Sequence, residues 1–152
     1  MGRLVSLVNS ASIVSSASVV AIGSLLAACT PFESFDVGGV RRDVLVHGPD
    51  ASDMPVVIVF HGAYSNPEDM EDYSGFSDVA DDHDFLVAYP KGKFGLWNDG
   101  RIPDAYDDVA MTRALLDHLD AGYDVDLDRV FVTGISNGGF MSHRIGCELA
   151  DE

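Results

Sequence analysis

The strongest constraint on the fold is a series of short apolar runs rich in β-branched residues, separated by stretches long enough for helices. The runs are Pro55–Phe60, Phe85–Pro90 and Val130–Thr133. Runs that stay apolar at every position, instead of alternating with polar residues, are typical of strands buried on both faces of a parallel sheet. Parallel neighbours need long crossover connections, which are usually helices. The sequence therefore predicts an α/β domain with a doubly wound, mostly parallel sheet.

The connecting stretches carry helix signals. Helices are expected over residues 76–82, over the run that follows Asp107-Asp108, and over residues 140–148. The two aspartates occupy the place where a helix N-terminus favours negative charge. A polar loop through Asn66-Pro67 is expected before the first helix. One earlier strand is expected over residues 40–47, at an edge of the sheet.

The first thirty residues have the layout of an export signal. No charged side chain occurs between Leu4 and Phe32, and only Arg3 and the terminal amine precede this stretch. Its apolar part is interrupted by serine and glycine, and it is short for a spanning helix of about 20 apolar residues. We therefore expect an exported protein.

The leader ends in Leu26-Ala27-Ala28-Cys29, which resembles the bacterial lipobox. That resemblance implies a signal peptide over residues 1–28, cleavage before Cys29 and a lipid anchor on Cys29 that holds the chain to a membrane. Residues 29–36 would then be a tether, and residues 37–152 the folded domain, in an extracellular or cell-envelope lipoprotein. An ordinary secretory peptide and an uncleaved anchor are the alternatives.

Charge and cysteine content exclude other classes. The chain has 9 Lys and Arg against 25 Asp and Glu, a net charge of −16. Binding to nucleic acid depends on cationic contacts with phosphate, so a nucleic-acid partner is not expected. The two cysteines, Cys29 and Cys147, are too few for a disulfide framework or a four-cysteine zinc site. No metal site is expected.

Gly134-Ile135-Ser136-Asn137-Gly138 matches the pattern G-x-S-x-G. The serine follows a predicted strand and precedes a predicted helix, which is the context of a nucleophile elbow. Small residues at both glycine positions allow the strained turn that presents the hydroxyl. The alternative is a strand-to-helix turn that needs glycine for its geometry alone. The context favours Ser136 as a nucleophile.

A serine nucleophile needs backbone donors for the oxyanion of its tetrahedral intermediate. One is expected to be the N–H of Asn137, at the helix start. The second normally comes from the loop after an earlier strand, where His61-Gly62-Ala63-Tyr64 follows Phe60. Ala63 is the favoured donor and Tyr64 the alternative, while His61 and Gly62 are expected to shape the loop.

Several segments together carry a family resemblance. They are Val57–Gly62, Phe85–Pro90, Trp97–Gly100, Asp107–Val109 and Val130–Gly139. As an ordered set they resemble the α/β-hydrolase branch of secreted polyhydroxybutyrate depolymerases and feruloyl or acetylxylan esterases. The resemblance implies hydrolysis of polyhydroxyalkanoate or plant-wall esters through an acyl-enzyme, without a metal or organic cofactor. Trp97 would lie on the loop that lines the substrate mouth, or would pack that loop down.

The sequence departs from this family at the catalytic base and acid. In the fold the order is Ser, then Asp or Glu, then His, with the last two on later loops. Of the five histidines, only His143 follows Ser136, and along one helix it would lie about 10 Å away. We therefore expect the triad's acid and base to be absent. The expectation is an N-terminal fragment of a longer hydrolase, inactive alone and poorly soluble because an apolar parallel edge is uncovered.

Two other functions stay open at this stage. The chain could be a non-catalytic, lipid-anchored binding protein with a degenerate hydrolase fold. It could also be a peptidase or thioesterase of the same fold. The intact elbow argues against the binding protein, because a chain without catalysis has no chemical need for a strained Gly-x-Ser-x-Gly turn.

Overall fold

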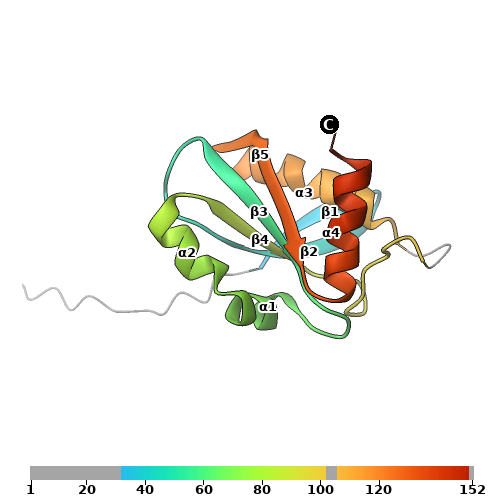
Figure 1. Ribbon diagram of the computed structural model, residues 1–152. Coiled ribbons are helices and arrows are strands. Elements are labelled where there is room, and N and C mark those ends of the chain that lie inside the picture. The colour runs from blue at the N-terminus through green and yellow to red at the C-terminus, as the bar shows by residue number, and fades with distance from the viewer. Residues whose placement is uncertain (1–31, 102–105, 151–152) are drawn as a thin grey trace, which may run out of the picture.

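The computed structural model describes residues 32–101 and 106–150. The predicted signal peptide and Cys29, with its proposed lipid anchor, lie outside these residues. In Figure 1 one mixed sheet runs through the middle of the molecule and helices cover both of its faces. The prediction of a doubly wound α/β fold is confirmed. Within the described ranges, no helix is long and apolar enough to cross a membrane.

The sheet contains five strands in the order β1-β2-β4-β3-β5. They are β1 (Glu33–Val37), β2 (Val40–His47), β3 (Met54–Phe60), β4 (Leu86–Pro90) and β5 (Val125–Gly134). Strand β3 pairs in parallel with β4 and with β5, whereas β2 runs antiparallel to both β1 and β4. Four of the five strands therefore point the same way, and β2 alone is reversed.

The apolar runs formed strands where expected. Strand β4 is buried at every position, and Val56, Ile58, Val59 and Phe60 of β3 are fully buried. Strand β5 differs from the expectation of a third buried strand. It lies at an edge of the described sheet, and Phe131 on it is 59% exposed. The expectation that this edge is uncovered therefore holds among the described strands.

Strand β1 corrects the prediction for the N-terminal part of the domain. Residues 33–36, which were expected in an irregular tether, belong to β1 and pair with β2 through a hairpin at Gly38 and Gly39. Strand β2 is consequently an inner strand, and the prediction that it forms an edge is wrong. The sequence signal of β1 is short: only Phe35 and Val37 alternate with polar residues, and Phe35 packs in the core.

The helices are α1 (Pro67–Ser74), α2 (Phe76–His83), α3 (Asp108–Gly122) and α4 (Asn137–Glu148). Helix α1 was missed, because Asn66-Pro67 was interpreted as a loop. The signal was present, since the Asn66 side chain accepts a hydrogen bond from the Asp69 N–H and proline occupies the first turn. Gly75, whose backbone has the left-handed conformation, separates α1 from α2.

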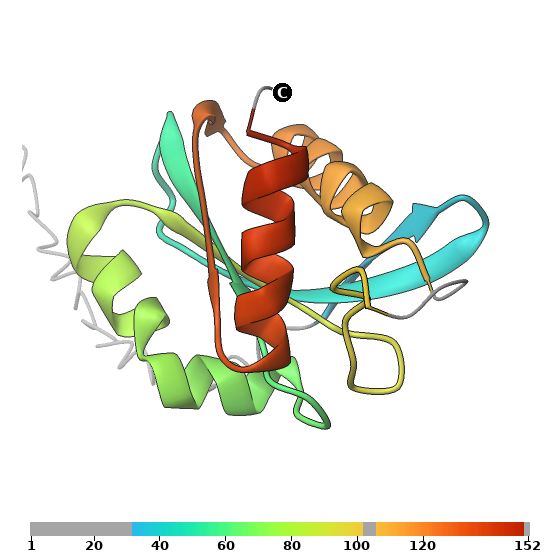
Figure 2. The ribbon, with the colours of Figure 1, turned by 45° about the vertical axis from the view of Figure 1, so that its right-hand side comes forward.

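The two faces of the sheet have separate apolar cores. Helices α3 and α4 contribute Met111, Leu115, Leu119, Met141 and Ile145 to the larger core, where they pack against strand residues such as Ile58 and Leu86. Met70 of α1 and Ala80 of α2 pack on the other face with Leu45, Val59, Val87 and Tyr89. Figure 2 shows α4 and α3 side by side.

The two aspartates before α3 have different roles. Asp107 is the N-cap, and its carboxylate accepts hydrogen bonds from the N–H groups of Val109 and Ala110. Asp108 is 1% exposed and forms an ion pair with Arg42, also buried, at 2.8 Å. Both aspartates lie at the N-terminus of α3, as predicted, and Asp108 in addition forms a buried ion pair.

Candidate active site

The turn between β5 and α4 holds Ser136 in a strained conformation. Its backbone angles, φ of 55° and ψ of −118°, lie in a region that residues other than glycine rarely adopt. Such a conformation costs about 1–3 kcal/mol, so the surrounding structure must hold it in place. Ser136 is exposed and immediately precedes the first residue of α4.

The glycines on either side of Ser136 allow three chain segments to come close together. A Cβ on Gly134 would lie 2.6 Å from Gly138 C, and a Cβ on Gly138 would lie 2.2 Å from the Phe60 carbonyl oxygen. Distances below 3.0 Å essentially never occur for real Cβ atoms. The Ile135 N–H also donates to the Phe60 carbonyl at 3.3 Å. The elbow is therefore pressed against the end of β3.

His61 follows β3 directly and is fully buried. The Gly92 N–H donates to its Nε2 at 3.0 Å, so this nitrogen carries no proton and Nδ1 donates to the Gly62 carbonyl at 2.8 Å. Burial lowers the pKa of His61, which favours the same neutral form. These contacts shape the loop, and both ring nitrogens are occupied.

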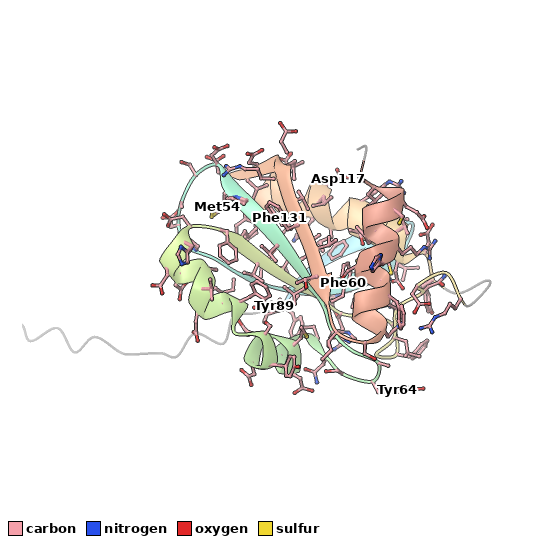
Figure 3. All side chains as sticks on the ribbon, in the orientation of Figure 1. Met54, Phe60, Tyr64, Tyr89, Asp117 and Phe131 are labelled. Atoms are coloured by element: carbon pink, nitrogen blue, oxygen red, sulfur yellow. The ribbon has the colours of Figure 1, made fainter. Side chains whose placement is uncertain are left out.

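The loop after His61 differs in its two candidate oxyanion donors. The Tyr64 N–H donates to the Gly95 carbonyl at 2.7 Å, so the alternative assignment of Tyr64 as a donor is wrong. The Tyr64 side chain projects away from the body of the domain, as Figure 3 shows. The Ala63 N–H donates to no group among the described residues. A Cβ on Gly62 would lie 3.8 Å from the Ser136 Cβ, so this loop borders the serine.

Trp97 is 1% exposed, and the expectation that it lines a substrate mouth is wrong. Its Nε1 donates to the His61 carbonyl at 2.9 Å, and its ring packs edge-on against Phe60 at 5.0 Å between centroids. The alternative interpretation, an aromatic residue that packs its loop down, describes these contacts.

The Asn137 side chain makes hydrogen bonds that the sequence analysis did not predict. Its Oδ1 accepts from the Trp97 N–H at 2.8 Å, and its Nδ2 donates to the Trp97 carbonyl at 3.1 Å and to Asp99 at 2.9 Å. The Arg101 guanidinium, together with this amide, keeps the pKa of Asp99 below its ordinary value. Only the Asn137 backbone had been assigned a role. Nothing in the sequence indicates that its side chain binds a loop 40 residues earlier.

None of the described histidines is positioned by a hydrogen bond to act as the base for Ser136. No hydrogen bond joins a histidine to the Ser136 hydroxyl within the part of the chain that is described. His47 pairs with Asp81 at 2.8 Å, and His118 pairs with Glu33 at 2.7 Å. His143 lies exposed on α4, seven residues after the serine. The described residues also contain no group of three side chains that could hold a metal ion.

Exposed aromatic side chains follow the elbow on α4 and lie on two of the loops. Tyr64 and Phe94 are each 84% exposed, and their loops are joined by the hydrogen bond between Tyr64 and Gly95. Phe140 is 56% exposed and follows Ser136 by one helical turn. The Phe94 ring packs against Tyr106, and the Arg101 guanidinium lies over the Phe140 ring at 4.5 Å.

Known proteins resemble the chain in sequence and in fold, although no family model matches it. NocK of Nocardia uniformis subsp. tsuyamanensis, which is named as an esterase, is 36% identical over 102 residues, covering 64% of this chain and 30% of NocK. Poly(3-hydroxyalkanoate) depolymerase C of Paucimonas lemoignei is 26% identical over 129 residues, covering 78% of this chain and 31% of that protein.

Among solved structures, a ferulic acid esterase superposes with a TM-score of 0.65 at 17% identity, covering 80% of this chain and 55% of that chain. The matched part of the chain spans about a third of the length of NocK and of depolymerase C. The described residues have the α/β-hydrolase fold of the corresponding part of the ferulic acid esterase structure.

Proposed function

We propose that this chain, which has the α/β-hydrolase fold of these esterases, carries the nucleophile and oxyanion donors of an exported serine hydrolase that cleaves carboxylic esters. The observation that carries the proposal is the strained, exposed Ser136. Strain of this kind persists only where surrounding contacts impose it, and it concentrates at functional sites. The crossing at Gly138 and the Asn137 hydrogen bonds supply those contacts.

In the proposed reaction, the Ser136 Oγ attacks the carbonyl carbon of the ester while a base takes its proton. The negative charge that forms on the carbonyl oxygen is stabilised by the backbone N–H groups of Asn137 and Ala63. The Asn137 N–H lies at the start of α4, where the helix dipole favours negative charge. The alcohol then leaves with a proton, and water hydrolyses the acyl-enzyme by the same route.

Three of the five histidines are engaged in other contacts, and no described histidine is hydrogen-bonded to Ser136. His61 is buried in its neutral form with both nitrogens engaged, and His47 and His118 pair with carboxylates on other elements. The proposal therefore places the acid and the base of the triad outside the residues described.

The proposed substrates are apolar or aromatic esters in a polymer, such as polyhydroxyalkanoates or plant-wall polysaccharide esters. The exposed side chains of Tyr64, Phe94 and Phe140 supply an apolar surface beside Ser136. The relatives named as a depolymerase and a ferulic acid esterase agree with this substrate class.

The N-terminal residues support a place outside the cytoplasm. We assign residues 1–28 to a lipoprotein-type signal peptide and Cys29 to a lipid anchor, because the uncharged leader ends in Leu-Ala-Ala-Cys. Export would bring the enzyme to polymers that are too large to enter a cell.

The test is labelling by a fluorophosphonate, which reacts with activated serines, in protein expressed from the complete gene. We expect one adduct, mapped to Ser136 by mass spectrometry, and its loss in Ser136→Ala. Ser142→Ala is the matched control, because Ser142 lies on the same helix and its hydroxyl donates to the Gly138 carbonyl. A folded product that is not labelled at Ser136 would refute the catalytic proposal and favour a binding protein.

A further inference from the structure

A small hollow with basic walls opens where β2 begins and β4 ends. Its volume is about 150 Å³. The residues that line it are Arg41, Arg42, Asp43, Lys91, Gly92, Lys93 and Phe94; we call it the basic hollow. Pockets for drug-sized ligands usually have about 300–1,000 Å³, so this one suits a small group.

The charge of the basic hollow is opposite to that of the chain. Four of the nine Lys and Arg residues line it, including both lysines, in a chain of net charge −16. Asp43 offsets one cation and the buried Asp108 another, which leaves two positive charges. No carboxylate among the described residues pairs with Lys91 or Lys93. Arg41 and Lys91 contribute to lowering the pKa of Asp43, after the hydrogen bond from Ser34.

Arg42 makes the basic hollow a built site, because its side chain is 3% exposed and fixed. One terminal nitrogen donates to Asp108 at 2.8 Å and to the Lys91 carbonyl at 3.3 Å. Its Nε is buried, and no described group accepts a hydrogen bond from it. An unpaired buried donor costs about 1–3 kcal/mol, and in a native protein it often marks the place of a bound ion or water.

The loop that carries Lys93 is held in place by the site around Ser136. A Cβ on Gly92 would lie 2.7 Å from the Leu96 carbonyl oxygen, and both Phe94 and Gly95 have positive φ, so the turn is tight. The Gly92 N–H is bound to His61, and the Gly95 carbonyl accepts from Tyr64. The basic hollow therefore has a fixed position next to the oxyanion loop.

We propose that the basic hollow binds a small oxyanion, a carboxylate or a phosphate, through Lys91, Lys93 and the Nε of Arg42. The ammonium groups of Lys91 and Lys93 lie 5.4 Å and 5.8 Å from the ring centroids of Phe32 and Tyr106, and neither pairs with a described carboxylate. Together with the buried guanidinium donor, they match the acceptor oxygens of such a group. The proposal does not depend on the activity proposed for Ser136, because it concerns binding alone.

The experiment is a titration of the full chain with inorganic phosphate and, separately, with glucuronate, followed by NMR or calorimetry at constant ionic strength set with sodium chloride. The variant is Lys93→Gln, which removes one charge from the basic hollow. Arg129→Gln is the charge-matched control, because Arg129 lies on β5 and pairs with Asp53 and Asp126. Thermal unfolding of each variant establishes that it is folded.

We expect saturable binding of at least one probe, weakened about tenfold by Lys93→Gln and unchanged by Arg129→Gln. The probe that binds more tightly identifies the source of the oxyanion. Binding of neither probe would overturn the proposal. Equal weakening by both variants would also overturn it, because that result reflects net charge and not a site.

Discussion

Replacing Gly138 by alanine puts a methyl group where the elbow crosses the end of β3. The new Cβ would lie 2.2 Å from the Phe60 carbonyl oxygen and 2.5 Å from that of His61. To restore a 3.0 Å contact from 2.2 Å, the two segments must separate by 0.8 Å. Both obstacles are backbone atoms, so no side chain can rotate out of the way.

The energetic cost follows from this overlap. Overpacking typically costs about 1–3 kcal/mol and can cost more when backbone must move. The movement also stretches the hydrogen bond from Ile135 to Phe60, whereas the gain in helix propensity from glycine to alanine is only about 1 kcal/mol. We expect Gly138→Ala to lower the free energy of unfolding by about 3 kcal/mol, a melting temperature lower by about 10 °C.

Helix α4 provides the matched controls. A Cβ on Gly146 meets nothing within 4 Å, so Gly146→Ala should raise stability by about 0.5–1 kcal/mol. A Cβ on Gly139 would lie 3.2 Å from the Gly134 carbonyl oxygen, so Gly139→Ala should fall between the two. Thermal unfolding followed by circular dichroism measures all three variants. If Gly138→Ala and Gly146→Ala were equally stable, the argument that the elbow is closed by backbone contact would be wrong.

Three further results are expected. Asn137→Ala removes the hydrogen bonds to Trp97 and should cost about 2 kcal/mol, with a red shift of the fluorescence of this single tryptophan; unchanged emission would contradict the contact. Burial lowers the pKa of His61 from 6.5, so below that pH the unfolded chain binds more protons than the folded chain. The free energy of unfolding should therefore fall as the pH drops below 6.5. His61→Gln should flatten the pH dependence of chemical denaturation in this range, and an unaltered profile would exclude His61 as its source. Phe131→Lys places a charge on the exposed edge strand β5 and should reduce light scattering at equal stability; unchanged scattering would exclude this edge as the contact between molecules.

The sequence predicted those parts of the fold whose signals are local. An apolar run such as that of β4 favours burial on both faces, so its place inside the sheet could be predicted. The similar run of β5 lies at an edge of the described sheet, where the rule fails. The elbow was predictable because the spacing of Gly134, Ser136 and Gly138 reflects one turn of backbone. Helix α1 was also predictable from its cap at Asn66, and overlooking that signal was an error of interpretation.

The errors concern features that depend on distant partners. Strand β1 pairs with β2, and its five residues show only a short alternation in which Phe35 and Val37 are apolar. The family resemblance left two positions open for Trp97, at the substrate mouth or packed under its loop. Its burial depends on Asn137 and His61, which are 40 and 36 residues away in the sequence. A single sequence contains no signal for such pairings.

The same distant contacts explain how the strain at Ser136 is maintained. Trp97 binds the His61 carbonyl, the Asn137 amide binds Trp97, and Gly92 binds the His61 ring, so the loops after β3, β4 and β5 form one hydrogen-bonded unit. Figure 2 shows these three loops at the same end of the sheet, where the parallel strands β3, β4 and β5 finish. A strained residue keeps its conformation only while the surrounding contacts impose it. Changes in the loop after β4 should therefore alter the elbow without touching Ser136, which makes this loop part of the site although its tryptophan is buried.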